Sequence, residues 1–130
     1  MKAFNIFCLL LICYQNSFCQ DSATNKFYFD YKLRADILIE WKLDSNGCKK
    51  LRGKYARKLE ENKYLIGMPK IVFIKNFGNP DYISDMVNYV YVANANCDNK
   101  LKIMEDFPRM ELVFLFRDDK LNHISILIVH

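Results

Sequence analysis

The sequence has few of the residues on which catalytic sites are usually built. Its 130 residues include only two histidines and four glycines. It has no Cys-x-x-Cys pair, no glycine-rich phosphate loop and no Gly-x-Ser-x-Gly turn. His123 falls in a predicted strand and His130 is the last residue, and neither has an identifiable nucleophile to activate. We therefore expect a protein that is not an enzyme, with no cofactor, no metal ion and no small-molecule substrate.

The acidic residues form no clear catalytic pattern either. Asp81 and Asp85 flank a predicted strand, Glu105-Asp106 lies in a predicted loop, and Asp118-Asp119 lies at a predicted hairpin tip. These are positions where Asp commonly serves in turns and caps. Two carboxylates can hydrolyse glycosidic bonds without histidine, so a carboxylate hydrolase is kept as the third hypothesis.

Long apolar runs are missing except at the N-terminus. Residues 6–14 are apolar, follow the single charge of Lys2 and precede small and polar residues, which is typical of a secretory signal peptide. The run is shorter than the roughly 20 residues needed to span a bilayer. We predict a signal peptide over residues 1–19 and one domain over residues 20–130, in which residues 20–26 are frayed.

Two interpretations of the cleavage region remain open. Ser17 and Cys19 are small residues that suit a signal peptidase, which would leave Gln20 as the new N-terminus. Alternatively, Cys19 is the acylated cysteine of a lipoprotein, although the residues before it fit a lipobox poorly. The first interpretation predicts an exported protein that is periplasmic or extracellular. The second predicts a lipid anchor in the outer membrane.

Cysteine is scarce in the predicted mature chain. Of the five cysteines, Cys8, Cys13 and Cys19 belong to the signal region, and Cys48 and Cys97 remain. An even pair in an exported protein is first interpreted as a disulfide. A Cys48–Cys97 bridge would close a loop of about fifty residues, which in the chain-entropy model contributes several kcal/mol.

The hydrophobic pattern predicts helices first and strands afterwards. Apolar residues at three- and four-residue spacing predict helices over 27–44, 48–61 and 71–77. Alternating apolar residues predict a strand over 86–93 and a hairpin over 110–129. The expected fold is α+β, with two helices and a short third helix packed on one face of a three-stranded antiparallel sheet.

Positive charge is concentrated in the predicted second helix, where no acid lies between residues 49 and 58. Nucleic acid is not an expected partner, because the protein is predicted to be exported and this face lacks interleaved aromatics for stacking. An anionic membrane surface is a possible partner, at about 1 kcal/mol per well-placed cation. The alternative is a solvated helix face. The candidate contact residues are Lys50, Lys54, Arg57 and Lys58.

A second candidate surface lies on the predicted strand 86–93. If Tyr89 and Tyr91 face one side of the sheet and Val90 and Val92 the other, both faces carry apolar groups. Only one face is needed to pack the helices, so the other could bind a protein. Tyr89 and Tyr91 are therefore candidate contacts. The alternative is that they only cover the outer face.

Several motifs resemble those of a known group. A Trp-x-x-Asp-x-x-Gly-Cys-x-x-x-Arg pattern over 41–52 is followed by Gly-Met-Pro at 67–69, Phe-Gly-Asn-Pro-Asp at 77–81 and the C-terminal hairpin. This combination resembles small exported bacterial proteins of the SmpA/OmlA (BamE-like) and β-lactamase-inhibitor-protein-like group. Gly67, Gly78 and Pro80 match the group's Gly-x-(Ser/Thr)…Leu-Gly-x-Pro element.

The resemblance covers Trp41 to the C-terminus and implies protein binding without catalysis. The group supports outer-membrane protein assembly or inhibits an extracytoplasmic enzyme, and fold alone does not transfer either role. We expect a non-enzymatic, exported domain that binds a protein in the bacterial periplasm or cell envelope. The alternative is a membrane-surface or outer-membrane assembly accessory, lipidated at Cys19, that contacts anionic lipid through the basic helix.

Overall fold

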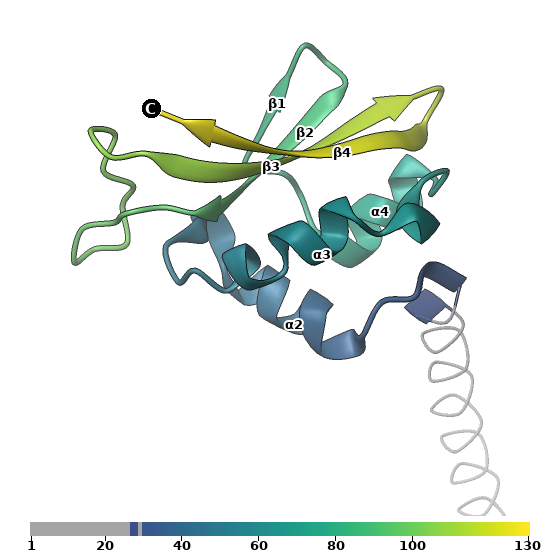
Figure 1. Ribbon diagram of the computed structural model, residues 1–130, viewed down its shortest axis with the longest axis horizontal. Coiled ribbons are helices and arrows are strands. Elements are labelled where there is room, and N and C mark those ends of the chain that lie inside the picture. The colour runs from purple at the N-terminus through teal and green to yellow at the C-terminus, as the bar shows by residue number, and fades with distance from the viewer. Residues whose placement is uncertain (1–26, 29) are drawn as a thin grey trace, which may run out of the picture. The chain divides into compact units, whose positions relative to one another are not determined.

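The computed structural model describes residues 27, 28 and 30–130, which fall into two units (Figure 1). The larger unit runs from Arg34 to His130. The described part of the smaller unit is a short helical turn, in which the amide of Leu33 donates to the carbonyl of Tyr28 at 3.1 Å. The predicted signal peptide and Cys19 lie outside the described residues. In the part of the chain that the structure describes, no helix is long and apolar enough to cross a membrane.

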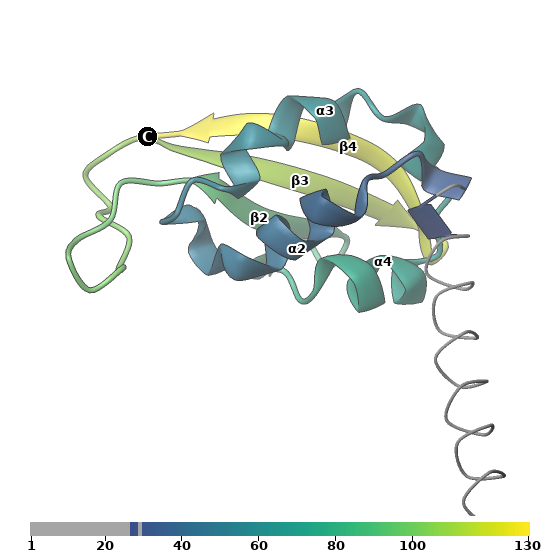
Figure 2. The same ribbon diagram turned by 90° about the horizontal axis from the view of Figure 1, so that it is seen from below.

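The unit from Arg34 onward places its helices on one face of an antiparallel sheet (Figures 1 and 2). Its α-helices are α2 (Ala35–Leu43), α3 (Ala56–Glu60) and α4 (Lys70–Phe77). Short 3-10 turns form η1 (Ser45–Gly47), η2 (Arg52–Lys54) and η3 (Lys63–Leu65). The strands are β1 (Tyr82–Ser84), β2 (Asn88–Asn94), β3 (Arg109–Arg117) and β4 (Lys120–Val129), and they lie side by side in chain order.

Aromatic rings fill the space between the helices and the sheet. Trp41 on α2 is fully buried, and its ring centroid lies 5.7 Å from that of Phe77 and 5.4 Å from that of Tyr91. Phe73 stacks on Phe77 at 4.3 Å and contacts Phe114 on β3 at 4.6 Å. Burying an aromatic side chain such as Phe contributes about 1.5–3 kcal/mol. This cluster therefore fixes α2 and α4 against β2 and β3.

The prediction of an α+β fold is confirmed, but the sheet has four strands among the described residues rather than three. The missed strand is β1, which pairs with β2 through Ile83 and Tyr89. It has only three residues, and both Tyr82 and Ile83 are exposed. A three-residue strand without alternating buried and exposed side chains has no apolar–polar pattern that the sequence could reveal.

The predicted second helix over 48–61 is wrong as a continuous element. Lys50 has a left-handed φ of 59°, which interrupts a right-handed helix. Gly53 lies against β2, where an added Cβ would be 3.1 Å from the carbonyl oxygen of Ala93. Only the turn η2 and the short helix α3 form in this stretch.

The other local predictions fared better. The predicted first helix over 27–44 is interrupted at Lys32, whose φ of 52° is left-handed, and α2 begins at Ala35. The third helix is confirmed as α4, and it ends at Gly78, whose φ is 83° and whose amide donates to Ile74. The hairpin is confirmed as β3 and β4. Its tip, Asp118-Asp119, has two left-handed residues, as a two-residue type I′ turn requires.

Candidate functional site

The motif over residues 41–52 folds into a polar corner in which Asp44 and Arg52 are buried and meet Asp81, an exposed residue from the segment before β1. The Asp44 carboxylate accepts hydrogen bonds from the backbone amides of Lys49 at 2.9 Å and Arg52 at 3.0 Å. The Arg52 guanidinium donates to Asp81 at 2.7 Å and to the carbonyl of Trp41 at 3.1 Å. Asp44 is fully buried and Arg52 is 4% exposed.

Each charged group of this corner forms hydrogen bonds or an ion pair with other residues of the protein. The Arg52 guanidinium lies 5.1 Å from the ring centroid of Trp41 and 5.3 Å from that of Tyr91, within cation–π range. Asp81 also accepts a hydrogen bond from the amide of Val92 at 2.7 Å. Charges that a fold buries are paired or hydrogen-bonded, as Asp44 and Arg52 are here. The polar corner is therefore structural.

Cys48 and Cys97 join this corner to the loop that follows β2. Their Sγ atoms are 2.00 Å apart and their Cα atoms 5.6 Å apart, within the range that a disulfide needs. Oxidation of the pair in the protein's own compartment stays a prediction. The same loop is also tied down through Asn46, whose side-chain amide donates to the carbonyl of Leu101 at 3.2 Å.

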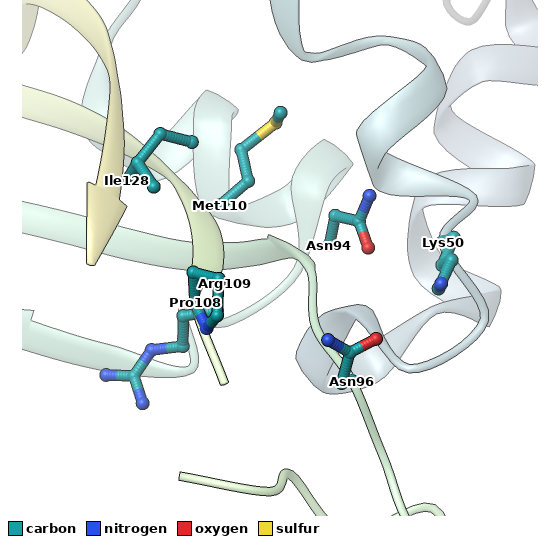
Figure 3. Close-up of a pocket in the computed structure, with 7 residues that line it drawn as sticks. All are labelled: Lys50, Asn94, Asn96, Pro108, Arg109, Met110 and Ile128. Atoms are coloured by element: carbon teal, nitrogen blue, oxygen red, sulfur yellow. The ribbon is translucent and has the colours of Figure 1, made fainter. Parts of the chain in front are cut away.

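Beside the disulfide is a hollow of about 320 Å³, which we call the disulfide-end pocket (Figure 3). Its residues come from the loop before η2, from the ends of β2, β3 and β4, and from the segments that adjoin β2 and β3. They are Lys50, Asn94, Asn96, Pro108, Arg109, Met110 and Ile128.

The disulfide-end pocket has an apolar side and a polar side. Met110 and Ile128 are cross-strand partners on β3 and β4 and project from the sheet (Figure 3). Lys50 comes from the opposite loop, and Asn94 and Asn96 lie between the two sides (Figure 3). Ile128 is 56% exposed although it sits in a strand. The pocket thus combines an apolar surface with a cation and two amides.

The polar groups on this side have no partners among the described residues. No ion pair forms at the Lys50 ammonium, and no hydrogen bond forms at the side-chain amides of Asn94 and Asn96, within residues 30–130. Arg109 differs, because its guanidinium turns away and donates to Glu111 at 2.7 Å. That hydrogen bond raises the pKa of Arg109. Lys50 is therefore the cation of the pocket that is free to bind.

A second hollow, of about 300 Å³, lies at the other end of the sheet, and we call it the hairpin-end hollow. Tyr89, Phe116 and Val87 are among the residues that line it and give it apolar surface. Met86 at its edge is 92% exposed and has a left-handed φ of 62°. Its rim is charged, but Lys70 and Asp119 already form an ion pair there.

The two candidate tyrosines have different surroundings. The prediction that Tyr91 forms part of an exposed surface is wrong, because its ring packs against Trp41 and Phe73 and is fully buried. Its hydroxyl donates to the carbonyl of Gly78 at 2.7 Å, and burial raises its pKa. Tyr89 is half-buried and lines the hairpin-end hollow. The two side chains point to the helix side of the sheet, where only Tyr91 is covered completely.

The four candidate basic residues do not form one helix face, because the predicted helix is broken. Lys54 pairs with Glu40 at 3.3 Å, and Arg57 pairs with Glu61 at 3.9 Å. Lys58 is exposed on α3, and Lys50 lies in the disulfide-end pocket. The structure therefore separates Lys50 from the cations with which the sequence grouped it.

Sequence reasoning missed most of the disulfide-end pocket. Asn94 and Asn96 lie in a stretch that reads as a strand end and a loop, where asparagine is common for conformational reasons. Met110 and Ile128 fit the alternation of a strand and carry no sign of exposure. The one sequence feature that points to the pocket is the cysteine pair. Cys48 lies two residues before Lys50, and Cys97 directly follows Asn96.

A search for metal sites and comparisons with known proteins complete the description of the candidate site. Among residues 27, 28 and 30–130, no three His, Cys, Asp or Glu side chains lie close enough to hold a metal ion. The absence of catalysis and the resemblance to the SmpA/OmlA group both stay predictions. Comparison of the chain with protein-family models, curated proteins and solved structures gave no match.

Proposed function

We propose that this protein is a non-enzymatic, exported domain that binds another protein in the bacterial periplasm or cell envelope, and that the disulfide-end pocket is its main contact. One observation carries the proposal: the polar side chains of Lys50, Asn94 and Asn96 have no described partner and meet an apolar surface in one hollow. A few convergent polar groups beside apolar side chains are the usual composition of a binding site.

The surroundings of the pocket favour a protein as the partner. The loop between Asn96 and Pro108 exposes Leu101, Met104 and Phe107, which are 52%, 40% and 45% exposed. Aromatic residues and Met are enriched where proteins bind each other. A pocket alone would serve a small molecule, whereas a pocket next to exposed apolar side chains suits a partner that covers both.

Support for export comes from the sequence and from the cysteine pair. Residues 1–19 have the pattern of a signal peptide. A Cys48–Cys97 disulfide suits an oxidising compartment such as the periplasm. The resemblance to the SmpA/OmlA and β-lactamase-inhibitor-protein-like group also favours protein binding.

The membrane-surface alternative, lipidated at Cys19, is less favoured. It relied on one basic helix face against anionic lipid. Lys54 and Arg57 are already paired with Glu40 and Glu61, and the helix that would align them is interrupted at Lys50.

A site-specific crosslinking experiment tests the proposal. A photoreactive residue is placed at Asn96 in the full-length protein, which is then expressed with its own cell envelope. We expect a discrete protein adduct that an excess of the unmodified protein competes away and that Lys50→Glu abolishes. The matched control carries the photoreactive residue at Lys58, which is exposed but outside the pocket. Equal adducts from both positions, or none from position 96, would contradict the proposal.

A further inference from the structure

We infer that the disulfide-end pocket binds the free C-terminus of an extended polypeptide whose last side chain is apolar. This inference deepens the proposed function and rests on it. The terminal carboxylate would lie at Lys50, and the last peptide unit at Asn94 and Asn96. The last side chain would lie on Met110 and Ile128.

The first argument is the position of the pocket on the sheet. Asn94 at the end of β2 pairs with Met110 on β3, and Met110 pairs with Ile128 on β4. The pocket therefore crosses the ends of three neighbouring strands, so a bound chain would lie across these strand ends.

The second argument is charge complementarity. The seven residues that line the pocket include no acid. Arg109 is neutralised by Glu111, and the Lys50 ammonium has no described partner. One uncompensated cation in a pocket suits one carboxylate, with which it would form a charge-assisted hydrogen bond.

The third argument is the match of hydrogen-bonding groups and size. A side-chain amide offers both donors and an acceptor, as a peptide unit does. Asn94 and Asn96 can therefore hold a main chain without selecting its sequence. A hollow of about 320 Å³ lies at the small end of ligand pockets, which is room for about one or two residues. Selectivity would come from the apolar contact with Met110 and Ile128.

The disulfide holds in place the two segments that carry Lys50 and Asn96. Cys48 lies two residues before Lys50, and Cys97 directly follows Asn96. Holding binding groups in place before the ligand arrives reduces the entropy lost on binding. Reduction of the disulfide should therefore weaken binding even where the fold survives.

The test uses short fluorescent peptides and measures the anisotropy of each with the exported protein. The first peptide ends in Phe with a free carboxylate, and the second is the same peptide as a C-terminal amide. The third is a C-terminal amide that carries Glu as its last residue, which supplies a carboxylate from a side chain. We expect the free acid to bind about tenfold more tightly than the amide, the loss typical of one charge-assisted hydrogen bond.

Variants assign that preference to the pocket. Lys50→Gln should abolish the difference between acid and amide, whereas Lys58→Gln, a matched change outside the pocket, should keep it. Equal binding of acid and amide would overturn the inference, as would a full preference in Lys50→Gln. Binding of the Glu amide as tightly as the free acid would also overturn it, because any acidic side chain would then suffice.

The crosslinking experiment separates this inference from the proposed function. If no peptide binds while the adduct from position 96 persists, the C-terminal inference is wrong and the proposed function stands. If the adduct is missing as well, both are wrong.

Discussion

Arg52 and Lys50 are two positions apart in the same basic run, yet the fold places them in opposite environments. Arg52 is buried in the polar corner, where a carboxylate, a backbone carbonyl and two aromatic rings surround its guanidinium. Lys50 is exposed at the disulfide-end pocket and has no described partner. The charge of Arg52 is used within the fold, and the charge of Lys50 is available to a ligand.

The comparison shows that local charge density says little about function. Neighbouring cations in a sequence form one surface only where the backbone keeps them on one face, and the left-handed residue Lys50 prevents that here. What distinguishes a structural charge is burial together with a full set of partners. The following predictions test whether the polar corner and the pocket can be separated experimentally.

The largest expected effect is on the polar corner. Arg52→Met should lower the free energy of unfolding by about 3–5 kcal/mol, because it removes the buried guanidinium that pairs with Asp81, donates to the Trp41 carbonyl and lies against two aromatic rings. Urea denaturation measures the change. The matched control is Lys50→Met, which should change it by less than about 0.5 kcal/mol. Similar losses in the two variants would show that the corner and the pocket are not energetically distinct.

The second largest effect on stability is expected from the Cys48–Cys97 disulfide, which joins the polar corner to the loop after β2. Replacing both Cys48 and Cys97 by Ser should cost about 2–4 kcal/mol, since the sequence separation is 49 residues. Denaturation with and without reductant checks this, because the double variant should not respond to reductant. Intact mass of the exported protein decides whether the bridge exists. Two free thiols in that sample would contradict the prediction.

The third effect distinguishes two glycines with left-handed backbones. At Gly47, φ is 74° and an added Cβ would lie 2.7 Å from the carbonyl oxygen of Val92. At Gly67, φ is 89° and no atom lies within 4 Å of an added Cβ. Gly67→Ala should cost about 1–2 kcal/mol from backbone strain alone. Gly47→Ala should lower the free energy of unfolding by more than Gly67→Ala does in the same denaturation assay. Equal losses would mean that β2 shifts to make room for the added Cβ.

The smallest effect on stability is expected at the pocket. Lys50→Gln should leave the free energy of unfolding within about 0.5 kcal/mol of the original, because the side chain is exposed and makes no described contact. The same variant should lose the preference for a free C-terminus. A loss of stability comparable to that of Arg52→Met would place Lys50 in the fold rather than in a binding site.

Much of the fold could be predicted because its signals are local. The spacing of apolar residues and Gly78 predict the helix α4. The alternation of apolar residues on either side of Asp118-Asp119 predicts the β3–β4 hairpin. Composition and cysteine count pointed to the Cys48–Cys97 pair without any structural information.

The remainder depends on contacts between distant residues. The left-handed turn at Lys50 lies within the stretch fixed by Asp44, Arg52 and the bridge to Cys97, and no local pattern records those partners. The alternation in β2 indicated two faces but not which one the helices cover, and for that reason Tyr91 was misplaced. The pocket is built from segment ends that meet only in the folded protein.

The Cys48–Cys97 bridge also has a mechanical consequence. A force applied between Arg34 and His130 reaches β3 and α2 directly, but it bypasses the chain between the two cysteines. With a separation of 49 residues, about 160 Å of contour length cannot be extended while the bridge is intact. Helices α3 and α4 and strands β1 and β2 lie inside that closed segment. A partner that pulls on the domain would therefore stretch only its outer portions, and the linked half would stay short.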